Sequence, residues 1–311
     1  MIEIYKTFDD GFRKVDEVET GCWVVMTAPS ATEILEISER CNIDVDHLRA
    51  PLDEEERSRI EVEDEYTLII VDIPTTEVRN DKDRHVTMPL GIIVSKDIIV
   101  TTCLEDTKIL RGFMDGRVRD FYTYKKTRFI LQILYRNASV YLQNLRILNR
   151  KTDEVERKLH IATKNRELIE LLEIEKSLVY FTTSLRSNEV VLEKMLKIDN
   201  IKHYPEDTEL LEDVIIENKQ AIEMANIYSG ILSGTMDAFA SIISNNQNIV
   251  MKFLATITIV MSIPNIIAGF YGMNVAGIPG SDSPYGFFLV IGVALLITFG
   301  TALLFWKKDL F

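Results

Sequence analysis

Hydrophobic residues gather in two long uncharged runs near the C-terminal end of the chain. The first extends from Phe253 to Ser281 and opens with 18 apolar or weakly polar residues, FLATITIVMSIPNIIAGF, and the second, from Gly286 to Trp306, has 21. A helix needs about 20 residues to cross a hydrocarbon layer of about 30 Å, so each run predicts a transmembrane helix. Two buried helices of a soluble core are the alternative, although uncharged runs of this length are rare in soluble folds.

The charges that flank these runs predict their direction. Lys252 precedes the first run, and Lys307 and Lys308 follow the second, whereas the connection 273–285 holds no base and one acid, Asp282. Cytoplasmic flanks carry an excess of Lys and Arg. We therefore expect a protein that crosses the cell membrane twice, with both termini in the cytoplasm.

Residues 1–116 combine short β-branched runs with an amphipathic helix, and they predict an α+β N-terminal cytoplasmic domain. Ala31–Cys41 has the helical spacing of apolar residues, and Ser95–Asp97 has the length and polarity of a hairpin loop. Pro51 and Pro74 are expected in loops between elements. The expected strands are Gly21–Met26, Tyr66–Ile73, Leu90–Val94 and Ile98–Cys103.

Long helices are expected after this domain. Residues 117–204 contain neither glycine nor proline, and their composition favours an antiparallel pair of helices. Residues 207–272 predict one continuous stalk helix, about 100 Å long at 1.5 Å per residue, that enters the first span. The expected divisions are an α+β domain 1–116, a helical region with the stalk 117–250, a first transmembrane helix 251–273, an external loop 274–284, a second transmembrane helix 285–306 and a basic cytoplasmic tail 307–311.

Composition sharpens this division. The chain has 35 Lys and Arg against 48 Asp and Glu, a net charge of −13. Residues 251–311 hold three of the bases and two of the acids, so the preceding 250 residues carry −14. An acidic body argues against nucleic acid as a partner, because phosphate binding needs clustered bases. The acid-rich stretch 53–65 predicts a solvated charged face, with a divalent cation contact as the alternative. The three cysteines lack metal-ligand spacing and are expected to be free.

A stripe of polar and small residues follows the stalk helix into the first span. Steps of four and three residues keep one face of a helix turned toward a common axis when helices bundle. Small residues at this spacing allow close packing, but polar groups inside membranes usually line a watery path. Two spans cannot enclose such a path alone, so we expect a cyclic homo-oligomer. The stripe comprises Asp237, Ser241, Ser244, Asn248, Met251, Ala255, Thr258, Ser262, Asn265, Gly269 and Gly272.

The first span ends in the motif Gly272-Met273-Asn274, preceded by Tyr271. At the outer end of the first of two C-terminal spans, this motif resembles the signature of the CorA family of magnesium channels. The resemblance implies a funnel-shaped homopentamer in the bilayer that conducts Mg²⁺ inward, with Co²⁺ and sometimes Ni²⁺ also carried. It implies a selectivity filter of these three residues, in which a ring of Asn274 amides binds Mg²⁺ through the waters that the ion retains.

The same resemblance implies a set of pore-lining residues that largely repeats the polar stripe, with Leu254 in place of Ala255. Met251 and Leu254 are expected to form an apolar constriction that closes by dewetting, and Asp237 an acidic ring that concentrates cations. The implied pore-lining residues are Asp237, Asn248, Met251, Leu254, Thr258, Ser262 and Asn265.

The resemblance also implies a gate controlled by intracellular Mg²⁺. In the family the ion sits between an acidic residue of the stalk and a carboxylate of the neighbouring subunit's α/β domain, and it holds the channel closed. Asp213 matches the stalk position, and Glu77 is our choice for the partner. A plain surface role for both carboxylates is the alternative.

The sequence favours a channel over four other functions. Uptake through an inside-negative potential of about 100 mV gains about 4.6 kcal/mol for a divalent ion, and no phosphate-binding loop for ATP-driven pumping occurs. A zinc-transporting branch of the same superfamily is one alternative, although all four histidines lie outside the spans. A non-conducting membrane-anchored helical signalling protein is another. No nucleophile and base arrangement suggests an enzyme.

Overall fold

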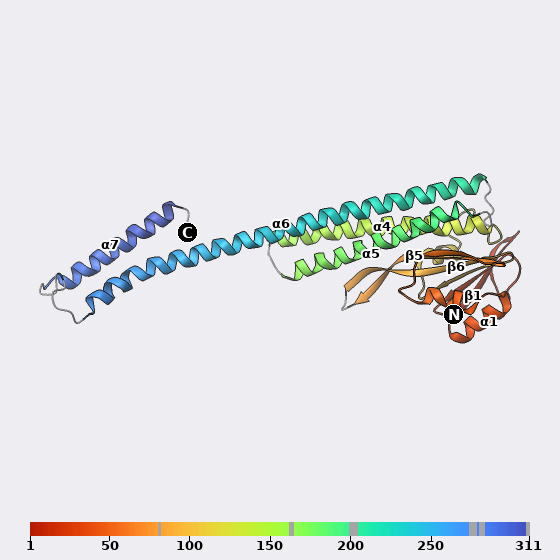
Figure 1. Ribbon diagram of the computed structural model, residues 1–311, viewed down its shortest axis with the longest axis horizontal. Helices are drawn as coiled ribbons and strands as arrows, with labels where there is room; N and C mark the ends of the chain where they lie inside the picture. The colour runs from red at the N-terminus through yellow and green to blue at the C-terminus, as the bar shows by residue number, and fades with distance from the viewer. Residues whose placement is uncertain (80–81, 162–164, 199–204, 274–278, 280–283, 309–311) are drawn as a thin grey trace. The chain divides into compact units, whose positions relative to one another are not determined.

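The computed structural model describes the chain except for residues 80–81, 162–164, 199–204, 274–278, 280–283 and 309–311. Its described part falls into two compact units, Met1–Met236 and Asp237–Phe311 (Figure 1). Helix α6, Pro205–Tyr271, is 67 residues long and contributes to both units. The prediction of one uninterrupted stalk helix that continues into the first apolar run is confirmed.

A seven-stranded sheet forms the centre of the first unit. Its strand order is β2-β1-β3-β7-β6-β5-β4. The β3–β7 pair is parallel, and the other five neighbouring pairs are antiparallel. The strands are β1 Ile2–Phe8, β2 Gly11–Val15, β3 Cys22–Thr27, β4 Arg59–Val62, β5 Tyr66–Arg79, β6 Lys82–Ser95 and β7 Ile99–Cys103.

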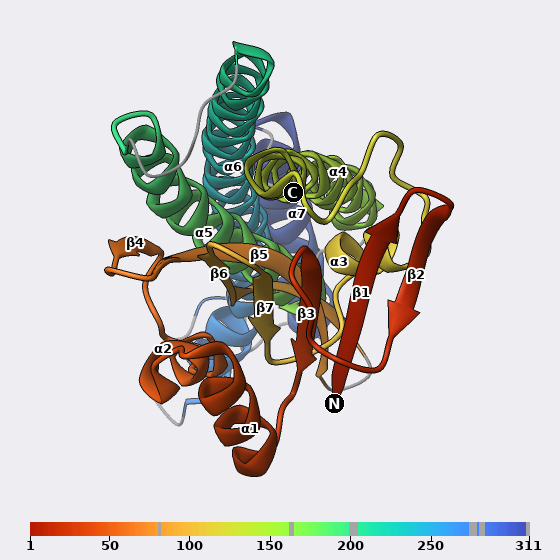
Figure 2. The same cartoon turned by 90° about the vertical axis from the view of Figure 1, so that its right-hand side faces the viewer.

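Helices cover both faces of this sheet (Figure 2). Helices α1 and α2 lie against one face, and α3, α4 and α5 lie against the other. Together with α6, they make the mixed α/β N-terminal body that the sequence predicts. The remaining helices of this unit are α1 Ala31–Cys41, α2 Val45–Arg49, the 3₁₀ turn η1 Ala50–Leu52, α3 Lys108–Met114, α4 Lys126–Ile161 and α5 Asn165–Met195.

Strand β3 shows why the central strands read as unbroken apolar runs. Trp23 and Val25 belong to the core under α3 and α4, whereas Val24 and Met26 belong to the core under α1 and α2. Successive side chains of a strand point to opposite faces, and both faces of this strand are covered. No position of the run Cys22–Met26 is therefore left for a solvent-facing polar residue.

Several local predictions are confirmed. Helix α1 has the bounds expected from its pattern, because Ser30 and Glu33 close its first turn as a capping box: the Glu33 N–H donates to Ser30 Oγ at 3.3 Å, and the Ser30 N–H donates to the Glu33 carboxylate at 2.7 Å. Strands β6 and β7 form the predicted antiparallel hairpin around Lys96.

The prediction that Pro74 lies in a loop is wrong. Pro74 lies inside β5, opposite Thr87 of β6. Strand β4 pairs with β5 only as far as Ile70, so the later residues of β5 have no strand on that side. Proline is tolerated at such an edge, because its missing N–H breaks no ladder hydrogen bond there. Pro51 lies in the 3₁₀ turn η1.

Helices α4 and α5 form the predicted antiparallel pair. The rings of Tyr141 and Phe181 pack edge to face at 5.2 Å, and Lys151 pairs with Glu170 at 3.9 Å. The α4 residue number rises between these two contacts while the α5 number falls, so the helices run in opposite directions. Leu131 of α4 and Leu192 of α5 belong to the same apolar core as the sheet residues, so both helices pack against the sheet.

The three cysteines are free, as predicted. Cys22 and Cys103 are buried and Cys41 is half-buried. Burial raises the pKa of Cys103 to about 12 and that of Cys41 to about 11. All three thiols are therefore protonated at neutral pH and behave as small apolar side chains.

The second unit contains the C-terminal part of α6 and helix α7, Gly286–Lys307. Both helices are long and apolar enough to cross a membrane. Large apolar side chains of α7 are exposed, among them Leu296 at 74% and Phe288 at 71%. Exposure of this kind over a whole helix is unfavourable in water and favourable in lipid. The C-terminal part of α6 and the whole of α7 lie where the two spans are predicted.

Candidate functional site

The apolar part of α6 has two unlike faces. Thr256 is buried, with 4% of its surface exposed, whereas Thr258 is exposed. Two residues correspond to about 200° around a helix, so the two threonines point to opposite sides. Helix α7 is the other described helix of this unit, and it runs alongside this part of α6 (Figure 1). The side of Thr258 is left exposed by the described residues.

Small residues line the less exposed face of α7. Ala294, Thr298 and Thr301 follow one another at intervals of four and three residues and are half-buried. The two threonine hydroxyls donate to the carbonyls four residues earlier in the same helix, at 2.7 and 2.8 Å. Small side chains with internally satisfied hydroxyls allow close packing of membrane helices.

The predicted pore-lining residues lie on the uncovered face of α6. Met251, Leu254, Thr258 and Asn265 are exposed, Ser262 is half-exposed, and Asp237 and Asn248 are exposed nearer the first unit. Their shared face follows from their spacing on one continuous helix. The described residues of one chain thus leave this stripe accessible to other copies or to water.

Hydrogen bonding differs along the stripe. The Thr258 hydroxyl donates to the Leu254 carbonyl at 2.7 Å, and the Ser262 hydroxyl donates to the Ile259 carbonyl at 2.8 Å. The Asn265 amide makes no hydrogen bond within the described part of the chain. It lies about 18 Å along the helix from Phe253, deep in the apolar run. An amide left unpaired in hydrocarbon is costly, so its partners must come from outside the described part of the chain.

Two residues of the predicted filter lie at the end of α6. The Gly272 N–H donates to the Ala268 carbonyl at 2.9 Å, and a Cβ at this position would approach the same oxygen to 3.2 Å. A residue without a side chain therefore fits the turn best. Met273 follows and is exposed. Asn274, the residue predicted to form the ring of amides, lies outside the described residues.

The two predicted gate carboxylates are both exposed in the first unit. Asp213 lies on α6, and Glu77 lies on β5 opposite Arg84 of β6. The Arg84 guanidinium pairs with Glu173 of α5 at 2.6 Å, so it is engaged away from Glu77. Neither Asp213 nor Glu77 forms an ion pair among the described residues. Both carboxylates are accessible to a cation or a neighbouring chain.

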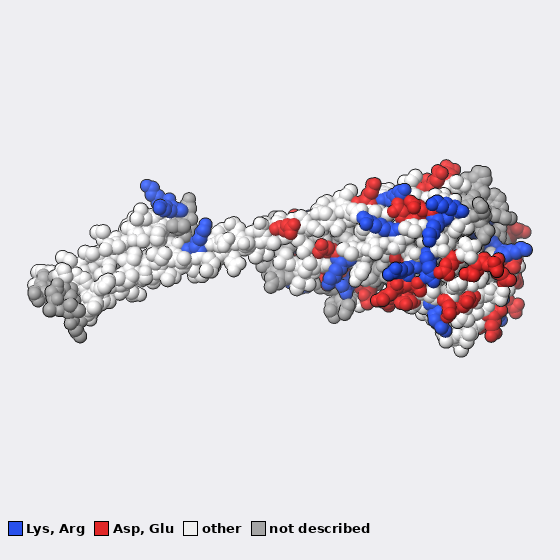
Figure 3. Space-filling view, in the orientation of Figure 1, with Lys and Arg blue, Asp and Glu red and all other residues white. Residues whose placement is uncertain are grey.

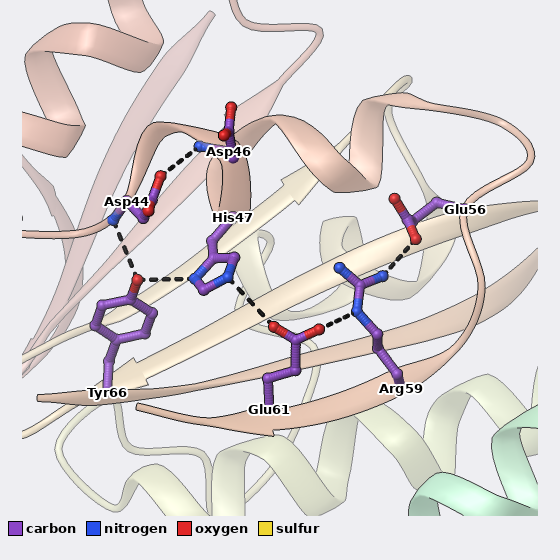
Figure 4. A network of polar contacts seen from close by, with 7 residues as sticks. All are labelled: Asp44, Asp46, His47, Glu56, Arg59, Glu61 and Tyr66. Carbon is purple, nitrogen blue, oxygen red and sulfur yellow. Dashed lines mark hydrogen bonds and ion pairs between the residues drawn. The ribbon is translucent and has the colours of Figure 1, made fainter. Parts of the chain in front are cut away.

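Two acids of the acid-rich stretch that follows η1, Glu56 and Glu61, form ion pairs (Figure 4). Arg59 contacts the carboxylates of both Glu56 and Glu61. Glu61 also faces His47 Nε2 at 3.3 Å, and His47 Nδ1 lies 2.8 Å from the Tyr66 hydroxyl. Donor atoms of His47, Glu61 and Glu63 lie within 4.8 Å of one another. The ion pairs fit the predicted charged face, and a cation here would compete with Arg59 for Glu61.

Sequence reasoning missed a cavity of about 470 Å³ between β6, α4 and α5. Arg84 and Glu173 line it, as do Lys151 and Glu170, so its charges are nearly balanced. His85 is buried at its wall, and its Nδ1 atom has no hydrogen-bond partner in the described part of the chain. These residues are separated widely in sequence, and no local pattern brings them together.

Comparisons with known proteins agree on one family. Residues 18–308 match the family model described as "CorA-like Mg2+ transporter protein". The cobalt/magnesium transport protein CorA of Methanocaldococcus jannaschii is 30% identical over 302 residues, which is 91% of this chain and 90% of the relative. Its counterpart in Thermotoga maritima is 22% identical, over 93% of this chain and 83% of the relative. The complete structure of the M. jannaschii transporter superposes with a TM-score of 0.85 at 26% identity and covers 100% of this chain and 99% of its own.

Proposed function

The chain belongs to the family of CorA-like Mg²⁺ transporter proteins, and we propose that it is a channel that admits Mg²⁺ to the cell down the electrochemical gradient. We propose that Co²⁺ and Ni²⁺ also pass through this channel. Two relatives, both named cobalt/magnesium transport proteins, support Mg²⁺ and Co²⁺ as the transported ions. Membership of a transporter family also favours the expectation that the chain is not an enzyme.

The observation that carries the proposal is the uncovered polar face of α6. The Asn265 amide, deep in an apolar helix, needs partners that the described residues of one chain do not supply. Convergence of this face from several copies places the amides around a common watery path, where water satisfies them. Helix α7 then lies on the outside, with its large apolar side chains toward lipid. A homopentamer is the assembly that the family resemblance implies.

The chemistry of this face suits a hydrated divalent ion. Mg²⁺ gives up its waters reluctantly, so neutral amide and hydroxyl oxygens that bond to those waters hold it without trapping it. Asn274 provides this contact at the external mouth, and Asn265 and Asn248 repeat it along the path. Between them Met251 and Leu254 form an apolar constriction, where the path closes when water leaves it.

Asp213 and Glu77 form the gate of this proposal. Their carboxylates come from neighbouring subunits and repel each other unless a cation lies between them. Intracellular Mg²⁺ supplies that cation and favours the closed arrangement, so rising internal Mg²⁺ limits its own entry. Asp237 adds an acidic ring on the cytoplasmic side. Both termini lie in the cytoplasm, as the lysines that flank the spans favour.

The zinc-transporting alternative has less support. Imidazole is the usual nitrogen ligand of Zn²⁺, and the two described histidine side chains, His47 and His85, lie on α2 and β6 of the first unit. No histidine occurs in either span. Membership of a transporter family likewise favours conduction over a purely signalling role.

Uptake of Mg²⁺ into proteoliposomes tests the proposed filter. The purified full-length chain is reconstituted with an inside-negative potential, and entry is followed with a Mg²⁺-sensitive dye for the wild type and for Asn274→Ala. We expect Mg²⁺ entry with the wild type and a loss of at least about tenfold with the variant, since a well-placed polar contact contributes at least about 1.4 kcal/mol. Equal fluxes would remove the proposed filter.

A further inference from the structure

Three lysines of the second unit form no ion pair with any of its described residues. The described residues of this unit, 237–308 with gaps at 274–278 and 280–283, contain Asp237, Lys252, Lys307 and Lys308 as their charged groups. All three lysines are exposed, and none forms an ion pair among the described residues. On the face that Figure 3 shows, acidic and basic side chains are spread over the first unit, whereas most of the second unit is uncharged.

The two helices bring these lysines to one level. Helix α7 runs back along α6 within the unit (Figure 1). From Lys252 to the end of α6 at Tyr271 the helix rises about 29 Å, and from the start of α7 at Gly286 to Lys307 it rises about 32 Å. The bases on both helices therefore lie at nearly the same distance from the connection.

Lys252 also lies away from the face proposed to conduct ions. Lys252 precedes Thr256 by four residues, so both project from one face of α6. Thr256 is buried, whereas Met251 and Thr258 are exposed on another face. Helix α7 ends at Lys307, and Lys308 follows it as the C-cap.

Apolar groups border this cluster on the membrane side. Phe253 follows Lys252, and Trp306 precedes Lys307 with 72% of its surface exposed. Tryptophan prefers the level of the lipid headgroups. The nearest acid of the unit before Lys252 is Asp237, about 22 Å away along the helix. Asp309 follows Lys308 in the sequence, outside the described residues, and one acid leaves an excess of two positive charges.

We propose that Lys252, Lys307 and Lys308 form a binding site for the anionic headgroup of a phospholipid. The ammonium groups donate to the headgroup phosphate, and the acyl chains lie along the apolar surface beside Phe253 and Trp306. A lipid is the occupant because the cluster borders the apolar surface directly and its charge is opposite to that of the phosphate. The site rests on the membrane position of α6 and α7 and is separate from ion conduction.

A thermal-shift titration of the full-length protein in neutral detergent tests this site. Phosphatidylglycerol should raise the apparent Tm of the wild type, whereas phosphatidylcholine and inorganic phosphate at the same concentrations should not. Each base near an anionic lipid contributes roughly a fivefold change in affinity. The triple variant K252Q/K307Q/K308Q should therefore bind phosphatidylglycerol about a hundredfold more weakly.

Two control variants separate charge from general damage. K252R/K307R/K308R keeps the positive charges and should respond like the wild type. K194Q/K197Q removes two exposed lysines of the first unit that form no ion pair among the described residues, and it should also respond like the wild type. Native mass spectrometry of the wild type, in which phosphatidylglycerol should be retained in preference to phosphatidylcholine, gives a readout that needs no variant.

The following results would overturn the proposal. A triple glutamine variant that responds to phosphatidylglycerol like the wild type shows that the lysines do not bind the headgroup. An equal response to phosphatidylcholine removes the dependence on negative charge. An equal response to inorganic phosphate identifies a free anion, in place of a lipid, as the ligand.

Discussion

The side-chain amide of Asn188 pairs with both backbone groups of Asp72. Asn188 Oδ1 accepts from the Asp72 N–H at 2.8 Å, and Asn188 Nδ2 donates to the Asp72 carbonyl at 2.8 Å. Asn137 and Tyr141 of α4 donate to the same carbonyl at 2.9 and 3.2 Å. Strand β4 has ended at this point of β5, so an amide from α5 takes the place of the missing strand and ties the helix pair to the sheet.

Replacing Asn188 with alanine should destabilise the first unit. The change leaves the half-buried Asp72 N–H without its acceptor, while the carbonyl keeps its contacts to α4. We expect a loss of about 2 kcal/mol, measured as a lower apparent Tm by differential scanning fluorimetry. Asn226→Ala, at an exposed position of α6, is the control and should leave Tm nearly unchanged. Equal effects of the two substitutions would contradict the pairing.

A second stability test concerns Gly91 of β6. A methyl group at this position would overlap the buried ring of Pro51 in η1. Gly91→Ala should therefore lower the stability by about 1–3 kcal/mol. The double variant P51A/G91A removes the ring that causes the overlap and should be more stable than the sum of the single effects predicts. If the Tm shift of the double variant equalled the sum of the two single shifts, the proposed steric overlap between a methyl group at Gly91 and the ring of Pro51 would be contradicted.

The buried His85 predicts a pH dependence of stability. Burial lowers its pKa, and Lys151 and Lys108 lower it further against the opposing charge of Asp83. The unfolded chain binds the proton near the ordinary pKa of about 6.5, so the folded state loses stability as the pH falls below that value. The apparent Tm should fall between pH 7.5 and pH 5, and less steeply in His85→Gln. Parallel curves for the two proteins would rule out this contribution.

The proposed gate predicts a specific loss of regulation. Asp213→Asn removes one carboxylate of the pair, so uptake into proteoliposomes should persist while inhibition by Mg²⁺ on the internal side weakens by at least about tenfold. Glu77→Gln should have the same effect. Glu212→Gln changes the neighbouring exposed acid of α6 and should leave the inhibition intact. Unchanged inhibition in both gate variants would remove this site from the account.

Local patterns predicted the elements whose cause is local. The apolar spacing and the Ser30 cap are both present in the residues of α1, and the absence of charge fixes the two spans. Proline next to an apolar run suggested the end of a strand at Ile73, but β5 continues to Arg79 because the edge beside Pro74 is unpaired. The edge strand β2, with the polar sequence GFRKV, gave no apolar run to recognise.

The candidate site divides in the same way. The polar stripe follows from the 3.5-residue spacing along one helix. That spacing is visible in the sequence, so it places Thr258 and Asn265 on one face without any tertiary information. The contact of Asn188 with Asp72 joins residues 116 positions apart and depends on the tertiary fold. The predicted bridge between Asp213 and Glu77 joins two copies of the chain, and it remains a prediction.

Mg²⁺ uptake through Asn265→Leu, compared with Ile266→Leu, tests most directly whether the polar face of α6 lines the conduction path. The first change removes the unpaired amide from that face, and the second is a nearly isosteric change at the next residue, which is also exposed. In proteoliposomes with an inside-negative potential, we expect Asn265→Leu to reduce uptake at least about tenfold and Ile266→Leu to retain it. Wild-type uptake through a correctly folded Asn265→Leu variant would contradict the account.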